Sequence, residues 1–161
     1  MFLDQATFRT VVAAIPLISI DLIVQNTEGK ILLGQRLNRP AQGFWFVPGG
    51  RILKNETLDL AFERLTRVEL GNCFLRNEAT FMGVYEHLYA DSVFGASPDT
   101  HYVVLAYHLL LPTDAQLRLP HTQHEHFRWS SLEEIRSSEE VHENTRAYLP
   151  VLPQADGLSK R

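Results

Sequence analysis

Apolar residues in this chain gather in short runs that are typical of β-strands. The first two runs flank a Thr-Glu-Gly turn and therefore predict a hairpin. Two later runs are longer and are separated by a polar stretch. Strands are expected at residues 16–26, 30–36, 79–90, 101–111 and 125–130. Residues 38–50 predict a loop, a short strand and a Pro-Gly-Gly break.

The clearest helix is expected at residues 57–70. Thr57 is suited to cap its N-terminus, Asp59 lies in the first turn, and Gly71 is suited to end it. Because strands outnumber helices and their order is mixed, we expect an α/β sandwich around a mixed sheet. Further helices are expected at residues 131–138 and 139–149, and residues 1–14 are compatible with another.

The helix at residues 57–70 carries one acidic residue on its apolar side. At about 100° per residue, Glu69 falls in the middle of the apolar stripe. A carboxylate on the buried side of a helix is costly unless a cation or a metal pairs with it. Glu69 is therefore either a functional ligand or an end-of-helix residue that turns out to water. The stripe consists of Leu58, Ala61, Phe62, Leu65 and Val68.

Length and composition predict one globular domain. The chain has 161 residues, of which 45% are hydrophobic and 21% are charged. Residues 1–161 are expected to form a single domain, with a frayed tail after Pro150. No apolar run approaches the roughly 20 residues of a membrane helix, and the N-terminus lacks the order of a signal peptide. With Cys73 as its one cysteine, the chain is expected in the cytoplasm, without a membrane partner.

The charge pattern argues against nucleic acid and in favour of small phosphate-bearing ligands. A net charge of −4 disfavours nonspecific binding to nucleic acid, so no such partner is expected. Five arginines nevertheless fall between residues 36 and 67, and guanidinium groups suit phosphate oxygens. A solvated basic surface is the alternative. The five are Arg36, Arg39, Arg51, Arg64 and Arg67.

The predicted helix and the loop before it carry a regularly spaced motif. Gly50 is followed after five residues by Glu56, and Glu56 after seven residues by Arg64. Glu69 and Gly71 come next. This spacing resembles the box of Nudix hydrolases, a loop-helix-loop that holds divalent metal against a diphosphate. The resemblance implies a Nudix-type α/β/α sandwich around a mixed β-sheet.

The motif departs from the family pattern at four positions. Leu65 and Val68 stand where the family has glutamates, and Thr66 and Asn72 stand where it has aliphatic residues. Several converging carboxylates can hold more than one Mg²⁺ for attack at phosphorus, whereas a single carboxylate suits one largely hydrated ion. We therefore expect one Mg²⁺ per site and a general base outside the helix.

One branch of the Nudix family, which hydrolyses GDP-mannose, shows the same departure. The chain is similar to it along nearly its whole length, in segments such as NRPAQGFWFVPGGR, AFERLT, THYVVL and RAY. The resemblance implies attack at the anomeric carbon of GDP-mannose or GDP-glucose with inversion, release of GDP and free sugar, and a homodimer. A Nudix pyrophosphatase that attacks phosphorus and a non-catalytic nucleotide-sugar-binding module remain alternatives.

The resemblance also assigns metal-binding and catalytic roles by position. It implies that Glu69, the Gly50 carbonyl and the Gln123 side chain bind Mg²⁺. His124 is expected to deprotonate water, since an ordinary imidazole has a pKa of about 6.5. Asp21 is expected near the sugar, where a carboxylate favours an oxocarbenium-like transition state. The alternatives for the histidine-rich run around His124 are a structural zinc site and an exposed loop without function.

The remaining roles concern the substrate. By the same resemblance, Arg51 and Arg64 orient the diphosphate and stabilise departing GDP, and Arg36 assists nucleotide binding. Tyr102 is expected to donate a hydrogen bond to a phosphate oxygen, and His87 is expected near the sugar. Packing in the core is the alternative for both Tyr102 and His87.

Overall fold

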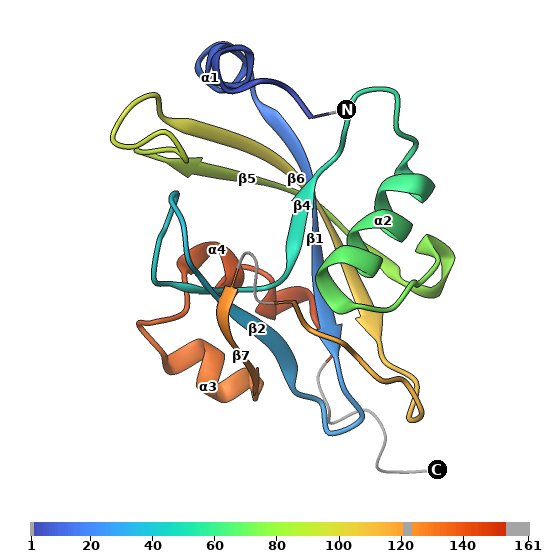
Figure 1. Cartoon of the computed structure of the whole chain (residues 1–161). Coiled ribbons are helices and arrows are strands. Elements are labelled where there is room, and N and C mark those ends of the chain that lie inside the picture. The colour runs from blue at the N-terminus through green and yellow to red at the C-terminus, as the bar shows by residue number, and fades with distance from the viewer. Residues whose placement is uncertain (1, 121–123, 154–161) are drawn as a thin grey trace.

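The computed structural model describes residues 2–120 and 124–153, and its strands form one seven-stranded sheet (Figure 1). The strand order is β3-β2-β1-β6-β5, with β4 beside β1 and β7 beside β2. β1 and β6 are parallel, whereas β1 and β2 are antiparallel, so the predicted mixed sheet and hairpin are confirmed. The strands are β1 (Leu17–Gln25), β2 (Ile31–Arg36), β3 (Trp45–Phe46), β4 (Gly49–Arg51), β5 (Thr80–Tyr89), β6 (Thr100–Leu110) and β7 (His124–Ser130).

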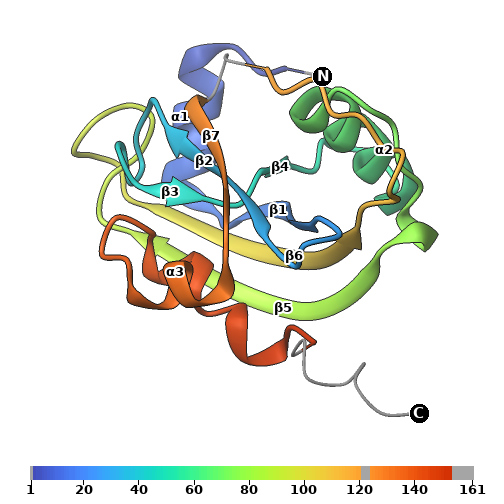
Figure 2. The same ribbon diagram turned by 90° about the horizontal axis from the view of Figure 1, so that it is seen from below.

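Helices cover both faces of the sheet. α2 lies on one face, and α3 and α4 lie on the other, as the two views in Figures 1 and 2 show. This arrangement confirms the predicted α/β/α sandwich. The helices are α1 (Gln5–Ala14), α2 (Leu58–Leu70), α3 (Leu132–Ser137) and α4 (Glu143–Arg146), with 3-10 turns η1 (Arg76–Glu78) and η2 (Leu149–Val151).

Alternation along β1 supplies both hydrophobic cores. Ile20, Leu22 and Val24 pack with residues of α2, whereas Ile23 packs with residues of α3 and the C-terminal turns. Successive side chains of a strand point to opposite faces. Asp21, which lies between Ile20 and Leu22, therefore points to the face opposite α2.

The α2 helix begins and ends as its sequence predicts. The Thr57 hydroxyl accepts a hydrogen bond from the Leu60 N–H at 3.2 Å, and Gly71 ends the helix in the left-handed region with φ 67°. The buried stripe is shifted from the predicted one. Val68 is 47% exposed, whereas Thr66 is fully buried and its hydroxyl accepts a hydrogen bond from the Phe74 N–H.

Two segments differ from the sequence predictions. The helix expected at residues 139–149 is reduced to α4, because Val141 instead forms a parallel bridge with Trp45 of β3. The expected Pro-Gly-Gly break is in part a strand, since Gly49 pairs with Asp21 across β4 and β1. A side chain at Gly49 would collide with the Ile20 carbonyl oxygen, so glycine permits this close approach.

The chain ends extend beyond the sheet. Residues 1–14 do contain a helix, α1, which is capped by Asp4 and contacts β6. At the other end, Leu152 is 4% exposed and still belongs to a core cluster, although the tail was expected to fray from residue 151. Residues 154–161 of that tail lie outside the described residues. None of the helices in the described ranges is long and apolar enough to cross a membrane.

Candidate functional site

A cavity of about 300 Å³ lies on the sheet face opposite α2. Its floor comes from three adjacent strands, β1, β6 and β5, whose alternate residues share this face. The volume is at the lower end of the roughly 300–1,000 Å³ that is usual for small-molecule sites. The floor residues are Leu17, Ser19, Asp21, His87, Tyr89, Thr100 and Tyr102.

The walls of the cavity come from segments that are distant in sequence. Phe8 and Val12 of α1 form one side, and β4 contributes Gly50 and Arg51. The loop that follows β2 adds further polar and basic groups. This convergence explains why α1 is part of the site although its sequence carries no recognisable motif. The loop residues are Asn38, Arg39 and Pro40.

Asp21 and His87 meet on the floor of the cavity through a third residue, Tyr148. The Tyr148 hydroxyl donates a hydrogen bond of 2.6 Å to Asp21 Oδ2, and its oxygen lies 3.4 Å from His87 Nε2. Burial raises the pKa of Asp21 to about 6, against the opposing effects of the Tyr148 hydrogen bond and the Arg36 charge. Burial also lowers the pKa of His87 to about 4, with a smaller contribution from His142.

Two arginines of the cavity are held by aromatic rings. The guanidinium carbon of Arg51 lies 4.0 Å from the centroid of the Phe8 ring, and that of Arg36 lies 5.5 Å from the Phe46 ring. Within the described residues, neither arginine forms an ion pair with a carboxylate. Their N–H groups therefore remain suited to phosphate oxygens, which guanidinium groups bind in a bidentate manner.

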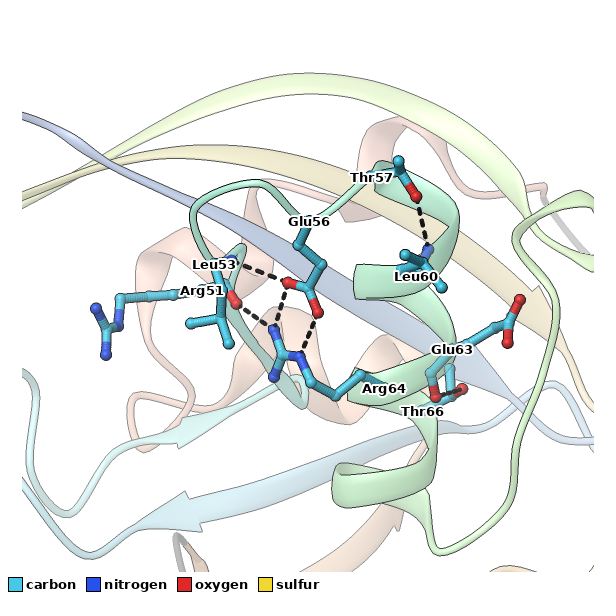
Figure 3. A network of polar contacts seen from close by, with 8 residues as sticks. All are labelled: Arg51, Leu53, Glu56, Thr57, Leu60, Glu63, Arg64 and Thr66. Atoms are coloured by element: carbon cyan, nitrogen blue, oxygen red, sulfur yellow. Dashed lines mark hydrogen bonds and ion pairs between the residues drawn. The ribbon is translucent and has the colours of Figure 1, made fainter. Parts of the chain in front are cut away.

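Arg64 is placed differently from Arg51 and Arg36. Its Nε lies 2.6 Å from Glu56 Oε1, and its Nη2 donates to Glu56 Oε2 at 3.0 Å and to the Arg51 carbonyl at 2.7 Å. Figure 3 shows the Arg51 side chain extending away from this network. Arg64 is not among the described residues that line the cavity. It connects α2 to the backbone of β4 and so supports Arg51.

Glu69 is buried, as the helical pattern predicts, with 1% of its surface exposed. It is not among the described lining residues of the cavity. Glu69 lies one helical turn after Leu65, and a Cβ at Gly50 would lie 2.5 Å from Leu65 Cδ2. Gly50 both lines the cavity and contacts α2, so it lies between the cavity and the helix face that carries Glu69.

The metal ligands predicted from the sequence include one acidic side chain, that of Glu69. Among the described residues, no group of three histidine, cysteine or acidic side chains could hold a metal. One buried carboxylate with a backbone carbonyl and waters is the donor set of a hydrated Mg²⁺. Gln123, the third predicted ligand, lies outside the described residues.

His124 is placed by its backbone. It is the first residue of β7 and pairs with Arg36 of β2, which lines the cavity. The position of its side chain is not among the described features. The backbone pairing puts this end of β7 next to the cavity wall.

The structure thus brings most of the predicted site residues to one cavity. Tyr89, which the sequence did not single out, also lines the cavity, and Tyr148 and Asn144 contact its lining residues from behind. Tyr148 contacts Asp21, and the Tyr89 hydroxyl accepts a hydrogen bond of 3.1 Å from the Asn144 side chain. Tyr148 lies in the segment RAY, whose resemblance to the family was visible without a role. The predicted residues at the cavity are Asp21, Arg36, Gly50, Arg51, His87 and Tyr102.

Comparisons with known proteins agree with this fold. A profile of the NUDIX domain matches residues 16–152. The chain is 40% identical over 107 residues to the low-salt glycan biosynthesis protein Agl8 of Haloferax volcanii. This match covers 66% of this chain and 67% of Agl8.

Solved structures show the same architecture. The MutT NUDIX hydrolase from Burkholderia pseudomallei is 26% identical, with a TM-score of 0.69 over 86% of this chain and 99% of that one. The NUDIX domain of Shewanella oneidensis NrtR, solved with ADP ribose, is 16% identical, with a TM-score of 0.63 over 92% of this chain and 96% of that one.

Proposed function

Because the chain belongs to the Nudix hydrolase family, we propose that it hydrolyses GDP-mannose and GDP-glucose at the anomeric carbon of the sugar. Water would attack that carbon with inversion and release GDP and the free sugar. The observation that carries this proposal is the composition of the cavity. A buried carboxylate, Asp21, shares it with two arginines that have no carboxylate partner among the described residues.

The positions of these charges suit cleavage of the carbon–oxygen bond. Arg36 and Arg51 would bind the diphosphate and stabilise the charge that develops on departing GDP. Asp21 would face the sugar, where its negative charge favours an oxocarbenium-like transition state. Tyr102 and His87 lie opposite each other on β6 and β5 and would contact the diphosphate and the sugar.

The general base would be His124. Its backbone lies beside Arg36, at the end of the cavity where the diphosphate would bind. A neutral imidazole there can accept the proton of the attacking water. One Mg²⁺, held by Glu69, the Gly50 carbonyl and Gln123, would neutralise charge on the diphosphate. Arg64 would act indirectly, through its hydrogen bond to the Arg51 carbonyl.

The relatives support a role in sugar metabolism. Agl8 is named for glycan biosynthesis, a process that consumes activated sugars. The replacement of two family glutamates by Leu65 and Val68 also favours this reaction over attack at phosphorus. Leu65 is 3% exposed and packs against Gly50, so an apolar side chain stands in place of a family glutamate beside this proposed metal ligand.

Hydrolysis of GDP-mannose in ¹⁸O-labelled water tests the proposal. We expect the label in the free sugar and none in GDP, because attack at carbon leaves the phosphorus–oxygen bond intact. The anomeric form of the fresh sugar, followed by NMR, should show inversion. Added chelator should abolish turnover, and Mg²⁺ should restore it. Label in GDP or in GMP would show attack at phosphorus, and absence of turnover would favour a binding module.

A further inference from the structure

The C-terminal segment places one hydroxyl group, that of Tyr148, against two residues of the cavity floor, Asp21 and His87. Tyr148 is 1% exposed, and its ring packs edge-on against Tyr85 with a centroid distance of 4.7 Å. From this core position the hydroxyl reaches Asp21, which is 127 residues earlier in the chain. The role of residues 141–149 could not be read from the sequence.

The Tyr148 hydroxyl can donate one hydrogen bond and can accept another. Tyr148 has a single hydroxyl proton, and the contact of 2.6 Å shows that Asp21 Oδ2 accepts it. The remaining lone pairs of the oxygen can only accept, and His87 Nε2 lies 3.4 Å away. A hydrogen bond between these two atoms therefore requires the ring proton of His87 on Nε2, which leaves Nδ1 without one.

The protonation states of the two side chains agree with this arrangement. Burial raises the pKa of Tyr148, so the hydroxyl keeps its proton at neutral pH. Burial lowers the pKa of His87 to about 4, so its ring is neutral and carries one N–H. The groups that face Asp21 from the neighbouring elements include Arg36 and Tyr89 as well as Tyr148.

Neighbouring residues of the same segment hold the tyrosine in place. Asn144 donates a hydrogen bond to the Tyr89 hydroxyl at 3.1 Å, and Tyr89 lines the cavity. The His142 ring stacks on Phe46 at a centroid distance of 4.7 Å. The segment is thus attached to the cavity through three side chains, so the Tyr148 hydroxyl has little freedom to move away from Asp21.

We propose that Tyr148 is a positioning residue of the active site, whose hydroxyl orients the Asp21 carboxylate toward the sugar and fixes the proton of His87 on Nε2. This inference rests on the proposed function. It extends the site from the residues of the motif to the C-terminal segment, through the chain His87–Tyr148–Asp21. The Tyr148 ring packs in the core, and the hydroxyl group alone acts on the site by its hydrogen bond to Asp21.

Replacing the hydroxyl while keeping the ring tests the kinetic role. Tyr148→Phe should lower kcat by about 10- to 100-fold, the loss expected for a hydrogen bond to a charged group. KM should change by less than about threefold, since the arginines that bind the diphosphate are untouched. Tyr107→Phe is the matched control. Tyr107 is 3% exposed in the core that faces α2, and its hydroxyl accepts a hydrogen bond from Arg76. The control should keep its kcat.

A double-mutant cycle separates positioning from structural damage. If Tyr148 acts through Asp21, the kcat of Asp21→Asn should fall by less than about threefold on adding Tyr148→Phe. A purely structural role would produce the same loss in both backgrounds and would overturn the inference. An unchanged kcat in Tyr148→Phe would also overturn it. A wild-type protein that does not cleave GDP-mannose at carbon would instead refute the proposed function.

The tautomer of His87 can be tested without turnover. We expect ¹⁵N–¹H correlation spectra of the imidazole rings, assigned with His87→Gln, to show His87 protonated at Nε2. In Tyr148→Phe this preference should weaken, because the acceptor for Nε2–H is lost. Protonation at Nδ1 in the wild-type protein would overturn the inference whether or not the variants fold.

Discussion

Asp21 lies on β1 between two residues of the core that faces α2, and its carboxyl group is the one acidic group among the described residues of the cavity lining. An ionised carboxylate in such a place is costly, and the raised pKa of about 6 expresses that cost. Tyr148 and Arg36 offset part of it. The strand therefore carries a destabilising residue that function would explain.

The first prediction concerns the acidic side of the pH–rate profile. Asp21 must be ionised and the proposed base, His124, unprotonated, so kcat/KM should fall with a limiting slope of two on a logarithmic plot below both the pKa of Asp21, about 6, and that of an ordinary imidazole, about 6.5. In His124→Gln one of the two protonations no longer matters, and the slope should fall to one. A slope that stays at two in this variant would mean that another base is involved.

Ionisation of Asp21, which activity requires, should lower the stability of the fold. Its folded-state pKa of about 6 exceeds the ordinary 3.8, so the contribution of Asp21 to stability is present below about pH 4 and is lost as pH rises through 6. Asp21→Asn should therefore unfold at higher denaturant concentration than wild type at pH 7, and the difference should disappear below pH 4. Equal stability at pH 7 would contradict the burial cost.

At the scale of elements, the loop before α2 is fixed to the helix by one ion pair. Glu56 accepts hydrogen bonds from the Arg64 side chain and from the Leu53 N–H at 2.9 Å (Figure 3). The Arg64 hydrogen bond holds the pKa of Glu56 below its ordinary value. Because Arg64 also bonds the Arg51 carbonyl, this pair determines where β4 presents Arg51 to the cavity.

A further prediction compares two ion pairs with the same contact distance of 2.6 Å. Glu56→Gln should lower the free energy of unfolding at pH 7 by about 1–3 kcal/mol, because the Glu56 side chain is 12% exposed. Asp59→Asn should cost less than about 1 kcal/mol, because Asp59 is 66% exposed. Chemical denaturation measures both values, and equal losses would argue against a structural role for the Glu56–Arg64 pair.

The pH dependence gives a further check on Glu56. A carboxylate with a lowered folded-state pKa contributes stability above its unfolded pKa of 4.5 and loses it as pH falls through the folded-state value. The difference between wild type and Glu56→Gln should therefore shrink as pH falls below 4.5. A constant difference would assign the loss to packing.

The elements that the sequence predicted well are those with local signals. The α2 boundaries followed from Thr57 and Gly71, whose capping depends on neighbouring residues alone. The extent of α4 could not be predicted in this way, since the bridge between Val141 and Trp45 joins residues far apart in the chain. Tyr148 was missed for the same reason, because its partner Asp21 lies on a distant strand.

At the scale of the whole molecule, the sheet face behind the cavity is partly uncovered. Ile18, Val84 and Leu88 are 52%, 59% and 68% exposed. They are near neighbours in the sheet, because Ile18 pairs with Val103, and Val103 pairs with Glu86 of β5 between Val84 and Leu88. β5 is also the last strand on its side of the sheet order. We call this apolar group the β5 patch.

The homodimer that the family resemblance implies needs a surface at which two copies meet, and the β5 patch is the surface tested below. A two-fold interface uses the same surface on both copies, and the patch lies behind the sheet face that forms the cavity floor, so it can be covered while the cavity stays open. An apolar strip of this kind, next to a free strand edge, also favours uncontrolled association unless it is covered.

The last prediction tests this assembly by changing one residue of the β5 patch. Val84→Glu should place a second carboxylate in the β5 patch next to the exposed Glu86 and raise the dimer dissociation constant by about 100-fold or more, since an unpaired buried charge costs several kcal/mol. Leu60→Glu is the matched control, because Leu60 is similarly exposed, at 57%, but lies on α2. Sedimentation equilibrium measures both, with circular dichroism to confirm folding. A wild-type protein that stays monomeric at all concentrations, or a dimer equally affected by both variants, would show that the β5 patch is not the interface.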